Sequence, residues 1–354
     1  MILRKFRFKN TDWELKDVDF GPLNLIVGRN AVGKSKTLVS LAGTLQFMRN
    51  DFPSNNIAHM ECELILESAQ TYIYSFSVTN NIIEKEYLAT SNGTKIIDRQ
   101  NGKSLLRGEI INPPVNTLIL QSRRDTENYP EFEEILNWAD HVTGFMFSSV
   151  SSFHYGEDNN FLFKGSYDFS ELFDKLDDEQ VKHLITTLKE LEYNVTDMKN
   201  ISIDAGREYK LTRIKEAGVN ANLFSFSLSN GMYRVIYLLV YMYYISSVKG
   251  ARCILIDDLG EGLDFDRSSK LSRILFSYCK KNNIQLIVTS NDDFLLNSIP
   301  LKYWIILSRK GSVVSSISNS TDPDLFKKFK FTGLNNFDLI SSDFIDRFFQ
   351  KEKH

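Results

Sequence analysis

Apolar and polar positions follow clear periods in the first fifty residues. Residues 2–8 roughly alternate, which predicts a strand, and LNLIV at 23–27 predicts a short buried strand that Gly28 ends. After Gly33, apolar side chains recur at helical spacing as far as about Arg49. This part of the chain therefore predicts a strand, a glycine-containing loop and a helix in succession.

The middle of the chain carries a different pattern. Between about 60 and 120, short β-prone runs are separated by Asn, Gly and Pro, and the last of these runs is NTLILQS. Such runs predict a mostly antiparallel sheet with hairpins. Helical spacing returns over 130–141 and 177–191, and a hairpin is predicted around Ala205-Gly206.

Strands and helices alternate in the last third. The pattern predicts a long helix after Gly231, a helix over 267–281 and a C-terminal helix near 342–351. Three strands are predicted, with the sequences CILIDD, IQLIVTS and YWIILSR. Alternation of this kind is typical of a parallel sheet with crossover helices, so the predicted fold class is α/β.

Composition narrows the possible functions. The 354 residues include 42 Lys and Arg against 45 Asp and Glu, so the formal net charge is −3 and any contact with DNA has to be local. Cys62, Cys253 and Cys279 form no C-x-x-C pair, which argues against a disulfide framework or a zinc knuckle. The N-terminus lacks the apolar core of a signal peptide, and the longest apolar run, 235–245, is too short to span a bilayer. We therefore expect a cytoplasmic protein without a membrane segment.

The loop after the first buried strand has the pattern G-x-x-x-x-G-K-[ST] of a phosphate loop. Its glycines let backbone N–H groups point at a phosphate, Lys34 supplies a charge to the β- and γ-phosphates, and Ser35 supplies a hydroxyl to Mg²⁺. The residues expected to bind nucleotide are Gly28, Arg29, Asn30, Ala31, Val32, Gly33, Lys34, Ser35 and Lys36. A chance glycine turn is the alternative, and it leaves the flanking strand and helix unexplained.

Carboxylates end a later buried strand. A phosphate loop requires one acid to hold Mg²⁺ through water and a second acid to orient the attacking water. CILIDD supplies Asp257 for the metal side and Asp258 for the water, and nearby Glu261 is a further catalytic candidate that would help Asp258 to activate the water. The alternative is that both aspartates merely end the strand.

A Ser-x-Gly turn precedes the long helix. Ser229 and Gly231 at a helix N-terminus present a hydroxyl and free backbone N–H groups to an anion, although Ser229 would also serve as an ordinary N-cap. The phosphate loop, this turn and the acidic strand end, in that order, resemble the ABC-type ATPase superfamily. Within it the chain is most similar to the RecF-like, SMC-like and OLD-family branch of prokaryotic AAA family ATPases.

The resemblance implies the cofactors ATP and Mg²⁺ and the way two copies meet. In the family two copies stack head to tail, so Ser229 and Gly231 of one copy are expected to contact the γ-phosphate held by Lys34 of the other. A homodimer or a higher homo-oligomer is therefore expected, with Asp264 as an interface residue.

Three further positions follow from the resemblance. Asp258 stands where many such ATPases have glutamate, and Asn291 stands where the family usually has a histidine that senses the γ-phosphate. Asparagine donates a hydrogen bond but carries no charge, so slow turnover is expected, and a scaffold that binds nucleotide without hydrolysis is an alternative. Gln121 is the candidate for the glutamine that contacts Mg²⁺.

The resemblance also implies how the α/β fold is divided. We expect an ABC-type ATPase head with a parallel phosphate-loop core, an antiparallel β subdomain and an inserted helical subdomain. Residues 1–125 are expected to form the phosphate-loop and antiparallel part, and 126–200 a mostly helical insertion. Residues 201–310 carry the Ser-x-Gly turn and the acidic strand, and 311–354 a C-terminal strand and helix.

Two basic segments are candidates for contacts with other molecules. Basic residues between Arg4 and Lys9 flank the first strand, which lies near the adenine in the family, and Trp13 is a candidate to stack on the base; a solvated basic face is the alternative. The segment FKKFKF at 326–331 suits nucleic acid or, equally, a short amphipathic helix with snorkelling lysines.

The expected function is a nucleotide-driven dimeric switch. Heptads for coiled-coil arms are absent, and the roughly sixty residues after IQLIVTS are too few for a Toprim nuclease domain, so a nuclease or toxin is expected on a separately encoded effector. By family analogy we expect an ATPase of a bacterial anti-phage defence system. The alternative is a RecF-like repair or recombination ATPase that clamps DNA, with strongly salt-dependent binding.

Overall fold

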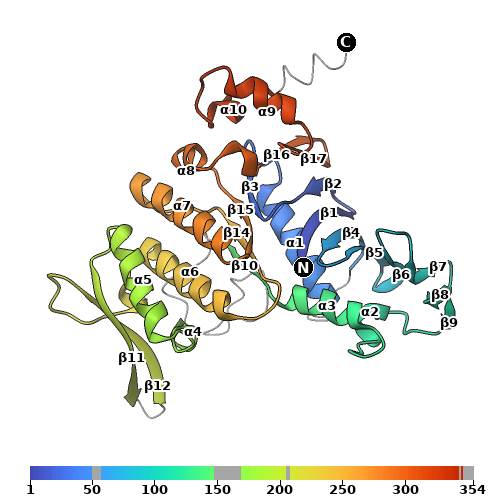
Figure 1. Ribbon diagram of the computed structural model, residues 1–354, viewed down its shortest axis with the longest axis horizontal. Coiled ribbons are helices and arrows are strands. Elements are labelled where there is room, and N and C mark those ends of the chain that lie inside the picture. Colours follow the sequence, from blue (N-terminus) through green and yellow to red (C-terminus); the bar gives the residue numbers. More distant parts are fainter. Residues whose placement is uncertain (50–56, 147–168, 205–207, 343, 346–354) are drawn as a thin grey trace.

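The computed structural model describes residues 1–49, 57–146, 169–204, 208–342 and 344–345 (Figure 1). The main sheet is built from β1 (Ile2–Asn10), β2 (Glu14–Asp19), β3 (Leu23–Val27), β4 (His59–Glu67), β5 (Thr71–Thr79), β6 (Ile82–Thr90), β7 (Lys95–Gln100), β8 (Lys103–Leu106), β9 (Glu109–Ile111), β10 (Val142–Met146), β14 (Cys253–Asp257), β15 (Gln285–Thr289), β16 (Trp304–Lys310) and β17 (Val313–Ser318). Their order in this described part is β10-β14-β15-β3-β16-β17-β2-β1-β4-β5-β6-β7-β8-β9. Strands β10, β14, β15, β3 and β16 run parallel to one another. Strands β1, β4, β5, β6, β7, β8 and β9 form an antiparallel meander.

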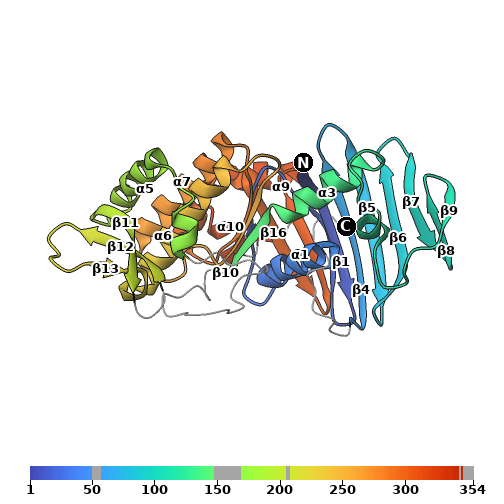
Figure 2. The same ribbon diagram turned by 90° about the horizontal axis from the view of Figure 1, so that it is seen from below.

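Helices cover the parallel strands, and a small second sheet stands apart. The helices are α1 (Lys34–Arg49), α2 (Ile119–Ser122), α3 (Pro130–Asp140), α4 (Phe169–Phe173), α5 (Asp178–Glu190), α6 (Asn230–Ser247), α7 (Phe265–Lys281), α8 (Asp293–Ser298), α9 (Pro323–Lys330) and α10 (Asp338–Ser341), with short 3₁₀ turns η1 (Ser225–Ser227) and η2 (Leu301–Tyr303). The second sheet consists of β11 (Val195–Asp204), β12 (Glu208–Glu216) and β13 (Leu223–Phe224). Figure 2 shows this sheet at one end of the molecule and β5 to β9 at the other.

The parallel strands are apolar on both faces because both faces are covered. Ile254 and Ile256 of β14 pack in the cluster that includes α6 and α7, whereas Cys253 and Leu255 pack on the opposite face with α1 and α3. Successive side chains of a strand point to opposite faces, so a strand covered on both sides needs an unbroken apolar run. The buried polar residues of these strands lie near the strand ends: Asn24 and Gln285 at the starts, and Asp257 and Thr289 at the carboxyl ends, where the candidate site lies.

Most elements predicted from the pattern are present. The strand, loop and helix at 23–49 are confirmed, as is the parallel arrangement of the three later strands. The prediction of a strand at NTLILQS is wrong, because Ile119–Ser122 form the short helix α2. Strand β10 lies within the segment expected to be an insertion, yet it pairs with β14 in the main sheet. The tip of the hairpin around Ala205-Gly206 and most of the helix near 342–351 lie outside the described residues.

A buried carboxylate explains the helix at 119–122. Glu86 of β6 has no exposed surface, and it accepts hydrogen bonds from the backbone N–H groups of Ile119 (2.6 Å) and Leu120 (3.0 Å) and from the hydroxyl of Tyr74 (3.1 Å). A helix start supplies such free N–H groups, so this long-range contact overrides the β propensity of the leucine-rich run. Burial raises the pKa of Glu86 to about 7 despite these donors.

We expect Glu86→Gln to flatten the pH dependence of stability. Because the pKa of Glu86 in the folded chain lies above its ordinary value of 4.5, the wild-type free energy of unfolding should fall as pH rises from about 4.5 to about 7, by on the order of 3 kcal/mol. Chemical denaturation of both proteins at pH 5 and pH 8 measures this difference. Glu84→Gln, at an exposed position of the same strand, is the control, and an equal slope in wild type and Glu86→Gln would contradict the prediction.

Candidate functional site

The phosphate loop connects the end of β3 to the start of α1. Gly28, Ala31 and Gly33 have φ of 154°, 61° and 113°, so the loop takes positive-φ backbone at three positions, two of them glycines. Since α1 begins at Lys34, the N–H groups of its first turn have no partner within the helix. These N–H groups and the positive end of the helix dipole favour a bound phosphate.

Lys34 is buried inside this loop. Its side chain is 6% exposed, and its ammonium donates hydrogen bonds to the carbonyl oxygens of Gly28 (2.8 Å) and Arg29 (3.3 Å). Burial lowers the pKa of Lys34, while the nearby charges of Asp258 and Asp257 raise it. The ammonium is thus held in position by the loop and lies close to both aspartates.

Asp257 is the last residue of β14 and Asp258 follows it; β14 pairs with β15, which in turn pairs with β3. Asp257 is 2% exposed and accepts a 2.6 Å hydrogen bond from the hydroxyl of Thr289, which in turn accepts one from the backbone N–H of Asp258 at 2.8 Å. Asp258 accepts a hydrogen bond from the side-chain amide of Asn291 at 3.2 Å. Parallel pairing brings the carboxyl ends of these strands to one edge, so Lys34 and the polar residues of both loops converge there.

The surroundings of Asp258 disfavour its ionised form. Burial raises its pKa, and the like charges of Asp257 and Glu261 raise it further, whereas Lys34 lowers it. A carboxylate with a raised pKa is a stronger base once it is ionised, which suits a group that orients or deprotonates water. The side chain of Ser35, half-buried at the start of α1, provides a hydroxyl at the loop.

The Ser-x-Gly turn lies against the loop that follows the acids. Ser229 is the N-cap of α6, and its hydroxyl oxygen accepts a 3.3 Å hydrogen bond from the N–H of Met232. A Cβ atom on Gly231 would lie 2.8 Å from the carbonyl oxygen of Gly262, so only glycine fits there. Within the described residues, no hydrogen bond joins Ser229 or Gly231 to the phosphate loop of the same chain. Asp264 is the exposed N-cap of α7.

The structure places Gln121 away from this site. Its side-chain amide donates hydrogen bonds to the carbonyl oxygens of Phe47 (2.5 Å) and Met48 (3.0 Å), near the C-terminal end of α1. Since α1 has 16 residues and rises about 1.5 Å per residue, this end lies about 20 Å from Ser35. The structure therefore contradicts the expected contact of Gln121 with Mg²⁺, because the amide of Gln121 instead caps the C-terminal end of α1.

A pocket of about 390 Å³ opens beside the first turns of α1. It is lined by Trp13, Lys36, Val39, Ile57 and His59, among others. Trp13 is only 4% exposed, and the ammonium of Lys36 lies 4.9 Å from its ring centroid. The pocket has the apolar walls and the size that a nucleotide base requires.

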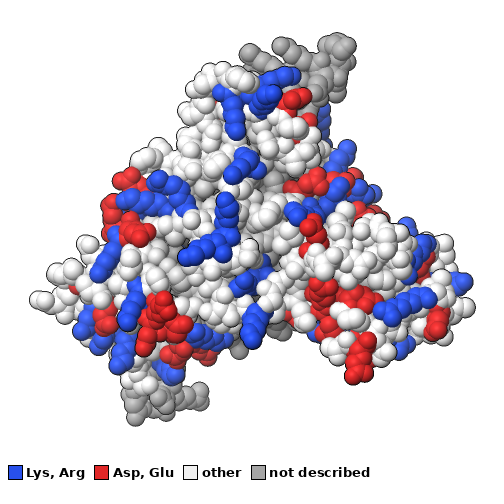
Figure 3. All heavy atoms as spheres, in the orientation of Figure 1, with Lys and Arg blue, Asp and Glu red and all other residues white. Residues whose placement is uncertain are grey.

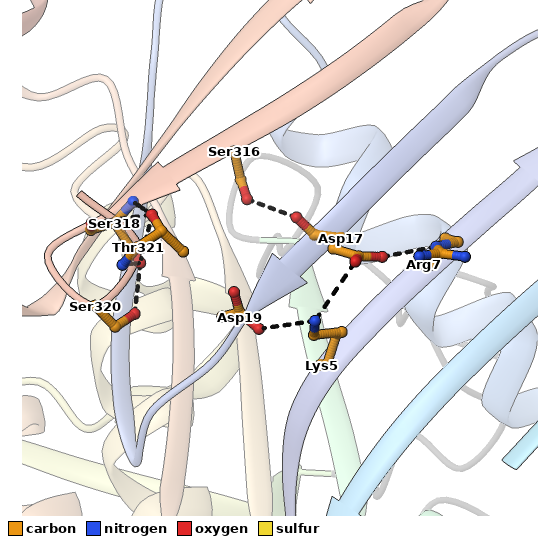
Figure 4. A network of polar contacts seen from close by, with 8 residues as sticks. All are labelled: Lys5, Arg7, Asp17, Asp19, Ser316, Ser318, Ser320 and Thr321. Carbon is orange, nitrogen blue, oxygen red and sulfur yellow. Dashed lines mark hydrogen bonds and ion pairs between the residues drawn. The ribbon is translucent and has the colours of Figure 1, made fainter. Parts of the chain in front are cut away.

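The structure gives other partners to most of the basic and aromatic groups of the two basic segments. In the first strand Arg4 pairs with Glu67, Lys5 with Asp17 and Asp19, and Arg7 with Asp17, as Figure 4 shows for the last two of these basic residues. Strand β1 is also an inner strand, between β2 and β4. In α9, Phe326 and Phe329 are buried at 0% and 1% exposure and are not free to stack on bases, whereas Phe331, directly after the helix, is 82% exposed. The amphipathic-helix interpretation of FKKFKF is the one the structure shows.

Two residues of the site were not predicted from the sequence. Thr289 joins Asp257 and Asp258, and its position two residues before Asn291 at a strand end could have indicated it. Arg309 of β16 donates a 3.3 Å hydrogen bond to the carbonyl oxygen of Ala31, and no sequence pattern marks it.

The described residues were also searched for metal-binding clusters and for membrane-spanning helices. Within the described ranges, no cluster of three or more His, Cys, Asp or Glu is placed to hold a metal ion. None of the helices in the same ranges is both long and apolar enough to cross a membrane.

Comparisons with known proteins agree with this geometry. Residues 23–297 match the profile of a family described as "AAA domain, putative AbiEii toxin, Type IV TA system". An SMC head crystallised with the C-terminal winged-helix domain of ScpA has 12% identity and a TM-score of 0.55, over 90% of this chain and 98% of that one. An SMC head with an extended coiled coil derived from Pyrococcus furiosus, bound to the C-terminal domain of ScpA, has 12% identity and a TM-score of 0.52, over 93% and 99%. At this identity the likeness shows the fold, and no curated protein sequence matches the chain significantly.

Proposed function

The chain belongs to this family of AAA domains and has the ABC-type ATPase fold of SMC heads, and from that premise we propose that it binds and hydrolyses Mg-ATP. The observation that carries the proposal is the convergence of Lys34, Asp257 and Asp258 where β3 and β14 end. A phosphate loop after one parallel strand and two carboxylates at the end of another strand of the same sheet are what phosphoryl transfer to water requires.

Each residue has a distinct role in the proposed reaction. The loop from Gly28 to Lys36 holds the phosphates through its N–H groups, and the Lys34 ammonium neutralises charge that develops on the γ-phosphate. Asp258 orients the attacking water and accepts its proton, with Asn291 fixing the carboxylate. Glu261 keeps the pKa of Asp258 raised, and the pocket beside Trp13 receives the base.

The oxygen donors at the site suit Mg²⁺. The Ser35 hydroxyl and the Asp257 carboxylate would hold it, directly or through water, and hard oxygen ligands are those that Mg²⁺ prefers. When bound, the ion would neutralise phosphate charge. The short link from Asp257 to Thr289 keeps that carboxylate oriented.

We propose that two copies complete each site. Ser229 and Gly231 are fixed at the start of α6 and make no hydrogen bond to the phosphate loop of their own chain in its described part, so a second copy would present them to the γ-phosphate. ATP would then close the homodimer, and slow hydrolysis by Asp258 would reset it.

We also propose that the chain divides into four parts at about residues 125, 200 and 310. The boundary at 200 falls within β11.

We further propose that the switch serves a bacterial defence system with a separately encoded effector in the cytoplasm. The family description names a putative toxin and a type IV TA system, which supports the defence setting alone. The proposal would fail if ATP-bound and nucleotide-free protein bound the co-encoded effector equally, because a switch must distinguish the two states.

A mixing experiment tests the dimer. We expect Lys34→Ala and Ser229→Asp each to be inactive alone, because aspartate still caps α6 but repels the γ-phosphate. In a 1:1 mixture half of the dimers are mixed and each has one intact site of two, so about a quarter of the wild-type rate should return. The measurement is the initial rate of Mg-ATP hydrolysis over a wide range of protein concentration. Full activity of Ser229→Asp alone, or no recovery on mixing, would contradict completion of the site in trans.

A further inference from the structure

Strand β16 continues past the end of its neighbour β3. After its pairing with β3 ends, β16 extends further over 307–310 and then turns into β17. The phosphate loop runs along this extension. A Cβ atom on Gly28 would lie 2.9 Å from the carbonyl oxygen of Leu307, and one on Gly33 would lie 3.3 Å from a methyl group of Val314. The β16–β17 hairpin therefore forms one wall of the phosphate loop.

Arg309 joins this wall to the loop. Its Nη1 donates a 3.3 Å hydrogen bond to the carbonyl oxygen of Ala31, and its Nε donates a 2.7 Å hydrogen bond to the carbonyl oxygen of Gly311, in the turn that follows β16. The planar fork of an arginine side chain can serve two acceptors at once. The turn thus fixes the guanidinium, and the guanidinium holds the loop.

Side-chain packing holds this part of the loop only weakly. Arg29, Asn30 and Ala31 are exposed, and together with the end of β16 they line a hollow of about 380 Å³. Ala31 also has a φ of 61°, in the left-handed region that is unfavourable for an L residue and readily adopted by glycine. A residue in such a conformation persists only where its surroundings hold it. Ala31 therefore needs a brace, and Arg309 contacts its carbonyl group.

The contact extends to Lys34 through a chain of hydrogen bonds. In a planar trans peptide unit the C=O and N–H groups point in opposite directions, so a donor on the carbonyl of Ala31 also fixes the direction of the N–H of Val32. That N–H donates to the carbonyl oxygen of Arg29 (3.3 Å), which also accepts from the ammonium of Lys34 (3.3 Å). Hydrogen bonds in such a chain strengthen one another. Arg309 is thereby linked to the ammonium that the phosphates require.

General attraction between charges does not single out Arg309. The chain has 42 Lys and Arg against 45 Asp and Glu, and Figure 3 shows Lys and Arg spread over one face of the molecule with Asp and Glu beside many of them. At about 0.15 M salt, exposed charges of this kind are screened over about 8 Å. One cation among so many contributes little to the field that ATP meets at a distance. The two directed hydrogen bonds of Arg309 are what distinguish its position.

We propose that Arg309 is a positioning residue that holds Ala31 in its left-handed conformation and so shapes the phosphate loop for the phosphates of a nucleotide. This role rests on the proposed binding of ATP. Since the loop holds the phosphates before and during hydrolysis, loss of the brace weakens binding of the ground state and the transition state alike. The effect therefore falls on Kd and KM more than on kcat.

Titration with the fluorescent nucleotide mant-ATP and Mg²⁺ tests the proposal. For Arg309→Ala we expect Kd and KM to rise about five- to tenfold, the effect of one exposed hydrogen bond from a charged donor, with kcat within about threefold of wild type. Arg309→Lys keeps the charge but loses the fork, so it should bind almost as weakly as Arg309→Ala. The matched control is Lys310→Ala, which removes an exposed charge whose side chain points to the other face of the sheet, and its Kd should stay within about twofold of wild type.

Substitution of Ala31 separates a brace from direct attraction of the phosphates. Glycine adopts the left-handed conformation without help, so in an Ala31→Gly background the loss caused by Arg309→Ala should shrink to less than about twofold. Equal losses in the two backgrounds would overturn the proposal. Wild-type affinity in Arg309→Lys, or an unchanged Kd in Arg309→Ala, would do the same.

Failure of this role and failure of ATP binding give different results. If the wild type did not bind mant-ATP, nucleotide binding itself would be refuted, and the role of Arg309 with it. If the wild type bound mant-ATP, Lys34→Ala did not and Arg309→Ala bound it normally, only the role of Arg309 would be refuted. Thermal denaturation shows whether each variant is folded, which we expect because the side chain of Arg309 is exposed.

Discussion

Lys34→Ala is expected to lower kcat/KM for Mg-ATP by on the order of a thousandfold, which corresponds to about 4 kcal/mol of lost transition-state stabilisation. The ammonium is buried and donates to the carbonyl oxygens of Gly28 and Arg29, so its charge acts at short range and with little screening by water. Alanine removes that charge and the ammonium donor from both carbonyl groups, although the carbonyl of Arg29 keeps the backbone N–H of Val32 (3.3 Å). Steady-state hydrolysis measures the loss, and fluorescent-nucleotide titration measures binding separately.

The control for this prediction is Lys16→Ala on β2, where the lysine is exposed. Its rate should stay within about twofold of wild type, since surface substitutions away from a site have small effects. Thermal denaturation of both variants shows whether the fold persists. If folded Lys34→Ala hydrolysed ATP at a rate near that of wild type, the phosphate site would not be the loop from Gly28 to Ser35.

The strand, loop and helix around the phosphate loop could be predicted because each signal is local. LNLIV is buried in β3, and Gly33 adopts a backbone conformation that favours glycine. Asp257 and Asp258 were predicted for the same reason, since they end an apolar strand, whereas Asn291 was predicted from the resemblance to ABC-type ATPases. Their convergence then depends only on those strands being parallel neighbours.

Features that depend on distant residues could not be predicted in this way. Gln121 ends a run with β propensity, but the buried carboxylate of Glu86, 35 positions earlier, converts this run into the start of a helix. Arg309 reaches Ala31 across a separation of 278 positions, and no period in the sequence encodes such a contact. The sequence of the basic first strand likewise predicts a charged surface. In the structure, Glu67 and Asp17 form ion pairs with Arg4 and Arg7 and neutralise this charge.

The departure at Asp258 from the glutamate common in similar ATPases has a structural counterpart. Asp258 has a φ of 53°, in the left-handed region that aspartate and asparagine tolerate better than most other side chains. Asp258→Asn can therefore keep the backbone and the contact with Asn291 while it removes the base. We expect kcat to fall by about a hundredfold to a thousandfold, with ATP binding within a few fold of wild type. Single-turnover hydrolysis and nucleotide titration measure the two quantities.

The pH dependence of kcat separates the base role of Asp258 from a purely structural one. Because burial, Asp257 and Glu261 raise the pKa of Asp258, kcat should fall on the acid side with a midpoint above the ordinary value of 3.8. Glu261→Gln removes one like charge and so lowers the pKa of Asp258, which should move this midpoint to lower pH whatever happens to the maximal rate. An unchanged midpoint in Glu261→Gln, or an Asp258→Asn variant that retains the wild-type rate, would show that another group handles the proton. In that case Asn291 and Thr289 would hold Asp258 for a role in the loop geometry alone, since both contacts persist without its charge.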